Sequence, residues 1–102
     1  MRIPSHRPLP HPGEVLLEEF LVPLGITQTE LAERIGISFR RVNELVNGKR
    51  GVTPDTALRL GRFFATTPDL WLNLQHAWDV WHVLNGRAGE EIERIEPLER
   101  AS

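Results

Sequence analysis

The segment TQTELAERIGISFRRVNELVNGKR, residues 27–50, predicts two short helices joined by a tight turn. Thr27 begins the first helix, because a threonine followed three residues later by Glu30 forms a capping box that satisfies free backbone N–H groups. Gly36 ends this helix in a left-handed conformation, and Ser38 caps the helix that follows. We expect the segment to bury its apolar side chains, which are Leu31, Ala32, Ile35, Ile37, Val42, Leu45 and Val46.

The polar side chains of the second of these helices have the chemistry of a DNA-reading element. A short helix that presents arginines and amides, packed across another helix, is a common way to enter the major groove. The candidate base-contacting residues are Phe39, Arg40, Arg41, Asn43 and Glu44. Helix starts attract phosphates through free N–H groups and the helix dipole, and basic side chains follow the DNA backbone. The candidate phosphate-contacting residues are Thr27, Gln28, Thr29, Ser38, Asn47, Lys49 and Arg50. The alternative is a solvated polar face on an ordinary pair of helices.

The flanking sequence predicts three more helices, over residues 12–21, 53–65 and 67–84. Each begins with a proline near its first position and an acid in its first turn. We expect Pro23 and Gly25 to end the first of them. Five helices with short loops and no strand-like alternation make the predicted fold class all-α. The apolar residues expected to be buried in these helices are Val15, Leu16, Phe20, Leu21, Ala57, Leu58, Leu60, Phe63, Phe64, Trp71 and Leu74.

The predicted organisation of the 102 residues is one domain with two extensions. Residues 1–11 contain three prolines and predict a flexible N-terminal arm, residues 12–85 form the helical domain, and residues 86–102 form an acidic tail. The formal net charge is −2, but residues 34–50 carry a net +4 and the tail a net −2. One end therefore suits phosphates and the other a basic partner. The path of the tail stays open between a helical turn and a short strand.

The composition narrows the functional class. The chain has no cysteine, so disulfides and thiolate zinc sites are excluded. No apolar run approaches the roughly 20 residues that a membrane span needs, and the N-terminus does not look like a signal peptide, so we expect a cytoplasmic protein. The four histidines lack the spacing of a metal site, and we expect them to be solvated. Without a phosphate loop or a catalytic cluster, we expect no enzyme, no metal and no cofactor.

Three tryptophans and Leu74 form a stripe along the predicted helix 67–84. We expect Trp71 and Leu74 to lie in the core. A domain of this size has a limited interior, and aromatic residues are favoured anchors of interfaces. We therefore predict that Trp78 and Trp81 lie in a dimer interface; the alternative is that they pack in the core against the first helix.

Further short stretches flank and overlap the 27–50 segment. They are HPGEVL (11–16), LA (31–32), NGKR (47–50), TPDTALRL (53–60) and WLNLQ (71–75). With these stretches, the 27–50 segment resembles the helix-turn-helix of the phage-repressor-like class (Cro/C1 or XRE). The chain as a whole resembles the narrower HigA/VapI group of antitoxins. The resemblance covers about residues 11–80 and leaves residues 82–102 outside it.

The resemblance implies a five-helix, lambda-repressor-like domain with a short C-terminal extension. It also implies an antitoxin of a type II toxin-antitoxin system, which neutralises a RelE-like mRNA-cleaving toxin and, as a homodimer, binds operator DNA to repress its own operon. Such toxins are typically basic, so two acidic surfaces are candidate docking sites. They comprise Glu14, Glu18 and Glu19 in the first helix and Glu90, Glu91, Glu93, Glu96 and Glu99 in the tail. Two alternatives remain, a stand-alone XRE-family repressor and a partner-sequestering protein with little DNA binding.

Overall fold

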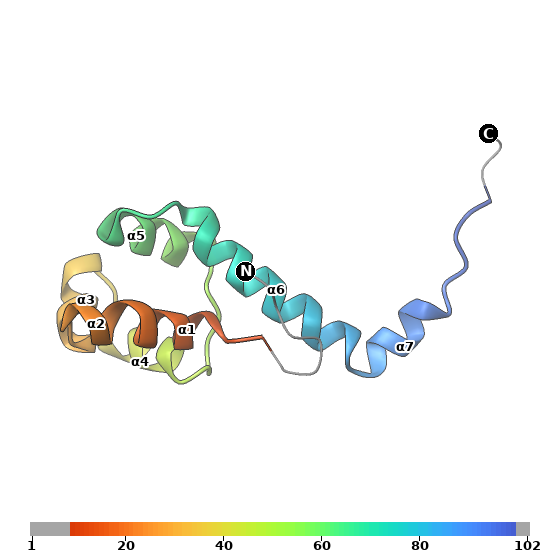
Figure 1. Ribbon diagram of the computed structural model, residues 1–102, viewed down its shortest axis with the longest axis horizontal. Coiled ribbons are helices and arrows are strands. Elements are labelled where there is room, and N and C mark those ends of the chain that lie inside the picture. Colours follow the sequence, from red (N-terminus) through yellow and green to blue (C-terminus); the bar gives the residue numbers. More distant parts are fainter. Residues whose placement is uncertain (1–8, 100–102) are drawn as a thin grey trace.

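The computed structural model describes residues 9–99 of the chain, so most of the predicted N-terminal arm lies outside the described residues. Its elements in order are α1 (Pro12–Val15), η1 (Leu16–Leu21), α2 (Val22–Leu24), α3 (Gln28–Ile35), α4 (Phe39–Val46), α5 (Pro54–Phe64), α6 (Pro68–Leu84) and α7 (Arg87–Glu93). The described residues contain helices and no strand, which confirms the predicted all-α helix-turn-helix fold. Helices α1 to α5 form a head, and α6 and α7 project from it as an arm (Figure 1).

The first helical stretch is longer than predicted. Elements α1, η1 and α2 follow one another without a break as far as Leu24, so the predicted end near Leu21 is wrong. Pro23 stays inside the stretch because η1 is a π-helical turn, in which the N–H of Val22 bonds to the carbonyl of Leu17 five residues back. This wider turn removes the usual clash between a proline ring and the preceding turn. Gly25, with a φ of 66°, then ends the stretch in the left-handed region.

Helices α3 to α6 all begin in the way the sequence predicts. In each case a threonine or serine with extended backbone accepts a hydrogen bond from the N–H three residues later, which satisfies one of the free donors of the first turn. The four bonds run to Thr27 from Glu30 (3.0 Å), to Ser38 from Arg41 (3.1 Å), to Thr53 from Thr56 (3.3 Å) and to Thr67 from Leu70 (3.3 Å). The predicted helix starts at these positions are therefore confirmed.

A single hydrophobic core joins the head to the first turns of α6. Its buried residues are Leu16, Leu21, Leu31, Ala32, Ile35, Val42, Leu45, Val52, Ala57, Leu60 and Trp71. Other predicted core residues are half-buried and pack against it, namely Phe20, Ile37, Val46, Phe63, Phe64 and Leu74, and Val15 is half-buried in α1. The prediction for Leu58 is wrong, because this side chain is 60% exposed. Helix α5 buries the face that carries Ala57 and Leu60, and Leu58 points away from that face.

His11 is buried rather than solvated as predicted, with 8% of its surface exposed. Its Nδ1 accepts the N–H of Gly13 at 2.9 Å and thereby caps α1. Its ring packs edge-on against Trp78 of α6, with ring centroids 5.0 Å apart. Burial lowers the pKa of His11, while the carboxylates of Asp79 and Glu14 oppose that shift.

Two glycines mark the places where helices approach most closely. A Cβ on Gly13 would overlap the carbonyl of Leu45, so glycine lets α1 lie directly against α4. A Cβ on Gly89 would overlap the carbonyl of Leu84, where the first turn of α7 meets the last turn of α6. Residues 87–93 of the tail are thus helical, and residues 95–99 have neither helix nor strand.

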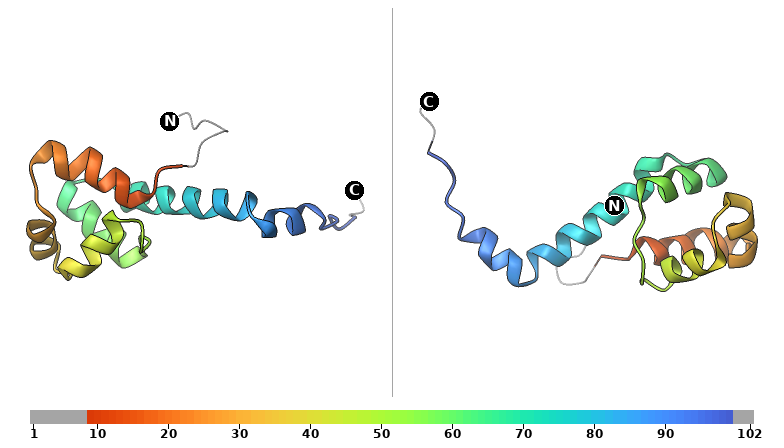
Figure 2. Two further views of the ribbon diagram at one scale, coloured as in Figure 1. Left: turned by 90° about the horizontal axis from the view of Figure 1, so that it is seen from below. Right: turned by 180° about the vertical axis from the view of Figure 1, so that it is seen from behind.

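Helix α6 has two distinct parts. Its first turns pack on α5 and α1, and the remainder extends beyond the head together with α7 (Figure 2). The molecule is consequently elongated, with extents of 55 × 29 × 25 Å. Among residues 9–99, no helix has the length and apolar character that crossing a membrane would require.

Candidate nucleic-acid interface

The turn between α3 and α4 is held by backbone hydrogen bonds and by the core beneath it. Gly36 adopts a φ of 75°, and the N–H groups of Gly36 and Ile37 both donate to the carbonyl of Ala32, at 3.0 and 3.1 Å. The buried residues of α3 and α4 meet in the core below this turn. The two helices therefore present their polar faces from one rigid unit.

The start of α3 lies next to the middle of α4. Asn43 donates from Nδ2 to Oε1 of Gln28 at 3.0 Å, and both side chains are partly buried. Thr27 and Thr29 are exposed beside this contact. The structure thus brings a predicted phosphate-contacting residue and a predicted base-contacting residue together, so the N–H groups that begin α3 lie next to the polar face of α4.

Glu44 of α4 lies between two arginines. Its Oε1 is 3.5 Å from Nε of Arg40 and 3.1 Å from a terminal guanidinium nitrogen of Arg50. The side chain of Arg40 is 87% exposed, and that of Arg50 is 44% exposed. One carboxylate therefore orients two accessible guanidinium groups, the first on α4 and the second on the loop after it.

The remaining predicted residues around α4 lie at its two ends. Ser38 and the half-exposed ring of Phe39 mark the start of the helix. At its end, Asn47 donates from Nδ2 to the carbonyl of Asn43 at 2.8 Å, and the same carbonyl accepts the backbone N–H of Asn47 at 3.0 Å. Lys49 is exposed in the loop that follows.

Arg41 points toward α5 and not along the same direction as Arg40. Its guanidinium donates to Oγ1 of Thr56 at 3.2 Å and lies 3.7 Å from the carboxylate of Asp55. Its Nε is buried and has no hydrogen-bond partner in the part of the chain that the structure describes. Base reading by Arg41 therefore requires this side chain to leave Asp55 and Thr56 when DNA binds.

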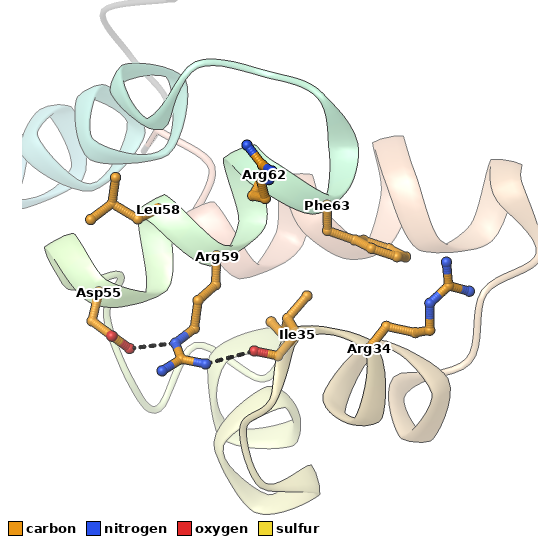
Figure 3. Close-up of a pocket in the computed structure, with 7 residues that line it drawn as sticks. All are labelled: Arg34, Ile35, Asp55, Leu58, Arg59, Arg62 and Phe63. Carbon is orange, nitrogen blue, oxygen red and sulfur yellow. Dashed lines mark hydrogen bonds and ion pairs between the residues drawn. The ribbon is translucent and has the colours of Figure 1, made fainter.

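Arg59 of α5 connects α5 to the end of α3 in the helix-turn-helix. Its guanidinium donates to the carbonyl of Ile35 at 2.8 Å and more weakly to that of Gly36 at 3.4 Å, and its Nε bonds to Asp55 at 2.9 Å (Figure 3). Asp55 thereby connects Arg59 with Arg41. Carbonyls at the end of a helix lack partners within the helix, so Arg59 satisfies acceptors that α3 leaves free.

Gln75 of α6 holds the loop that carries Lys49 and Arg50. Its Oε1 accepts the N–H of Val52 at 2.7 Å, and its Nε2 donates to Asp79 at 2.9 Å. The sequence reasoning missed the roles of both Arg59 and Gln75. Their only sequence signal is their place in the TPDTALRL and WLNLQ stretches, because the carbonyl and N–H groups that they bind are distant in the chain.

Trp71 of α6 is fully buried, as predicted, and its Nε1 donates to Oγ1 of Thr66 at 3.0 Å. Trp78 and Trp81 are half-buried, and the ring of His82 lies against both, at centroid distances of 4.1 and 5.0 Å. Their placement in a dimer interface stays a prediction.

Comparison with known proteins assigns the chain to a class and then to a group within it. A family model described as helix-turn-helix matches residues 17–71, and the chain belongs to this family. Antitoxin HigA-1 of Vibrio cholerae is 43% identical over 99 residues, which cover 96% of this chain and 90% of that protein. Virulence-associated protein I of Dichelobacter nodosus is 46% identical over 83 residues, which cover 78% of this chain and 77% of that protein.

A solved structure agrees with these relatives. The structure of Pseudomonas aeruginosa antitoxin HigA with the higBA promoter has a TM-score of 0.83 and 36% sequence identity to this chain. The match covers 89% of this chain and 99% of that one. The chain is therefore a member of the HigA/VapI group of helix-turn-helix proteins, which confirms the resemblance seen in the sequence.

Proposed function

We propose that this protein is the antitoxin of a type II toxin-antitoxin system and that, as a homodimer, it binds operator DNA and represses its own operon. The observation that carries the proposal is the surface formed by Gln28, Asn43, Arg40, Glu44 and Arg50, where amides and exposed guanidinium groups surround the polar face of α4. The HigA relative solved with the higBA promoter supports DNA as the partner of this surface.

The contacts divide by chemistry. We assign the free N–H groups, hydroxyls and basic groups around α3 and α4 to phosphates; these residues are Thr27, Gln28, Thr29, Ser38, Asn47, Lys49 and Arg50. We assign base reading to Phe39, Arg40, Asn43 and Glu44. The side chain of Arg41, a residue of α4, stays bound to α5 in this assignment, because Asp55 and Thr56 already engage its guanidinium. It acts as a positioning residue that fixes the angle of α4.

The dimer interface in this proposal is the projecting part of α6. Trp78 and Trp81 are only half-buried, and Leu84, three residues beyond Trp81 on the same side of the helix, is 58% exposed. A second copy packed against this face would remove these side chains from water. A two-fold axis through the contact would direct two α4 helices at major grooves about 34 Å apart.

The toxin in this proposal is a basic, RelE-like mRNA-cleaving protein. The glutamates of both predicted docking surfaces are exposed, so their carboxylates are available to a basic partner. On the first helix they are Glu14, Glu18 and Glu19, and on the tail they are Glu90, Glu91, Glu93, Glu96 and Glu99.

Two measurements test the proposal. Binding to the protein's own promoter should fall steeply as salt rises, because phosphate contacts release counterions. Lys49→Ala should reduce the salt dependence while keeping the preference for the promoter over random DNA. Co-expression with the product of the neighbouring gene should yield a stable complex. Equal binding to promoter and random DNA would refute operator binding, and a neighbouring product that remains unbound would leave a stand-alone repressor.

A further inference from the structure

A groove on the head combines an apolar floor with a cationic rim. It lies between the end of α3 and the exposed face of α5, with a volume of about 590 Å³ (Figure 3). Leu58, 60% exposed, and the half-buried ring of Phe63 supply the apolar surface. Arg34, Arg59 and Arg62 supply the charge, and Asp55 is the acid that lines the groove with them.

The three arginines are not equally engaged. Arg59 is bound to Asp55 and to the carbonyl of Ile35. Arg34 pairs with Glu30 at 3.6 Å, and its guanidinium lies 5.0 Å from the centre of the Phe63 ring. Arg62 is exposed and forms no ion pair within residues 9–99.

The groove fits a peptide that alternates apolar and acidic side chains. The exposed leucine and the phenylalanine ring that line the groove gain from covering by apolar groups, and the arginines gain from carboxylates. A DNA backbone would use the arginines and leave Leu58 uncovered. The chemistry of the groove therefore favours an acidic peptide with apolar anchors.

The chain carries such a peptide at residues 95–99, which read IEPLE. Ile95 and Leu98 are 68% and 85% exposed, and Glu96 and Glu99 follow each of them directly. The segment has neither helix nor strand, and its first residue, Ile95, is joined to the end of α7 by the bond from its N–H to the carbonyl of Ile92 at 3.0 Å. Helices α6 and α7 carry it to the end of the molecule away from the groove (Figures 1 and 2). Only a second copy brings groove and segment together.

We propose that residues 95–99 of one copy occupy the arginine-rimmed groove of a second copy, and that the contact is reciprocal. The inference rests on the dimer of the proposed function. Two α6 helices that cross in antiparallel fashion at Trp78 and Trp81 would send each tail toward the head of its partner. Leu98 and Ile95 then cover Leu58 and Phe63, and Glu96 faces Arg62.

The absence of cysteine from the chain allows a direct test by cross-linking. The variant Leu58→Cys/Leu98→Cys places one thiol in the groove and one on the tail. The matched control is Leu24→Cys/Leu98→Cys, because Leu24 is also 60% exposed but lies on α2. A disulfide needs Cα atoms within about 7 Å of each other. Mild oxidation should therefore convert the first variant into a covalent dimer on a non-reducing gel, without higher covalent oligomers. The control should remain monomeric on the same gel.

A charge exchange tests the same contact without cysteines. Arg62→Glu and Glu96→Arg should each weaken dimerisation by roughly two- to fivefold in sedimentation equilibrium, as expected for an accessible ion pair. Combining the two substitutions should restore the wild-type dissociation constant.

The outcomes separate the tail contact from the dimer itself. If the wild-type protein sediments as a monomer, the dimer of the proposed function fails. If it is a dimer but the groove and tail cysteines do not cross-link, or cross-link no better than the control, only the tail contact is refuted. Cross-linking into ladders would refute reciprocity. If Arg62→Glu weakens DNA binding without changing the mass, and the groove and tail cysteines do not cross-link, the groove is a phosphate-contacting surface and the proposal is overturned.

Discussion

The head and the arm of this molecule differ in the burial of their apolar side chains and in the bonding partners of their polar side chains. In the head, a core of apolar side chains is buried and polar side chains bond across helices, as Arg59 does with Ile35 and Arg41 does with Thr56. In the arm beyond Asp79, apolar side chains such as Leu84 and Leu98 are exposed, and the bonds of Asn85 and His82 stay within the helix. The head buries its core within a single copy, whereas the exposed apolar side chains of the arm form the surface that the proposed dimer would cover.

A matched pair of glycine substitutions tests this comparison with the largest expected effect. Gly13→Ala would force a Cβ into the carbonyl of Leu45 and separate α1 from α4, so we expect the free energy of unfolding to fall by about 3 kcal/mol. Gly89→Ala creates the same overlap with Leu84 in the arm. We expect it to release α7 and leave the thermal midpoint of the head unchanged. Equal losses of midpoint would mean that head and arm unfold as one unit.

Substitutions of two neighbouring arginines distinguish the reading of DNA bases from the positioning of α4. Arg40→Ala removes an exposed guanidinium and should lower operator affinity by about 1–3 kcal/mol, with a smaller effect on random DNA. Stability should not change, because the side chain is accessible to solvent. Binding to both duplexes and a thermal melt provide the measurements. A loss of affinity equal for operator and random DNA would contradict base reading by Arg40.

Arg41→Ala should behave in the opposite way. It removes the bond to Thr56 and the ion pair with Asp55, so we expect about 1 kcal/mol less stability. Operator and random DNA should be affected alike, since the tilt of α4 changes rather than one base contact. Asp55→Asn serves as the companion variant and should reproduce part of the loss. A selective loss of operator binding with unchanged stability would identify Arg41 as a base reader.

The smallest expected effect is the pH dependence of stability that arises from His11, whose ring packs against Trp78 of the arm. Burial lowers the pKa of His11 in the folded protein below its value in the unfolded chain. The unfolded state then binds the extra proton first, so stability falls as pH drops below about 6.5 toward the lowered folded pKa. His11→Asn keeps a capping oxygen and removes the proton site, and should flatten the curve of stability against pH. A curve equally steep in this variant would assign the acid sensitivity to other groups.

Local chemistry accounts for the parts of this fold that the sequence could predict. The caps at Thr27, Ser38, Thr53 and Thr67 each act within three residues, and helical periodicity identified most of the core around them. The errors have two causes, a contact between distant segments and a local departure from α-helical geometry. His11 is buried by Trp78, and Pro23 is accommodated by a π turn that the sequence pattern does not signal.

The residues of the candidate interface also divide into those that the local sequence predicts and those that depend on tertiary contacts. Exposed Arg40 and Arg50 could be named from their positions on and after one helix, and the structure places Glu44 between them. The engagement of Arg41 by Asp55 depends on the packing of α5 against α4. No spacing within residues 27–50 contains that information, so the split between reading and positioning arginines emerges only from the tertiary structure.

The most direct test of DNA reading by two α4 helices in one dimer is a hydroxyl-radical footprint on the protein's own promoter. We predict two protected regions related by an inverted repeat, with centres about 34 Å apart along the DNA, and loss of both with Arg40→Ala. Protection of a single region, or a footprint that Arg40→Ala leaves intact, would contradict it.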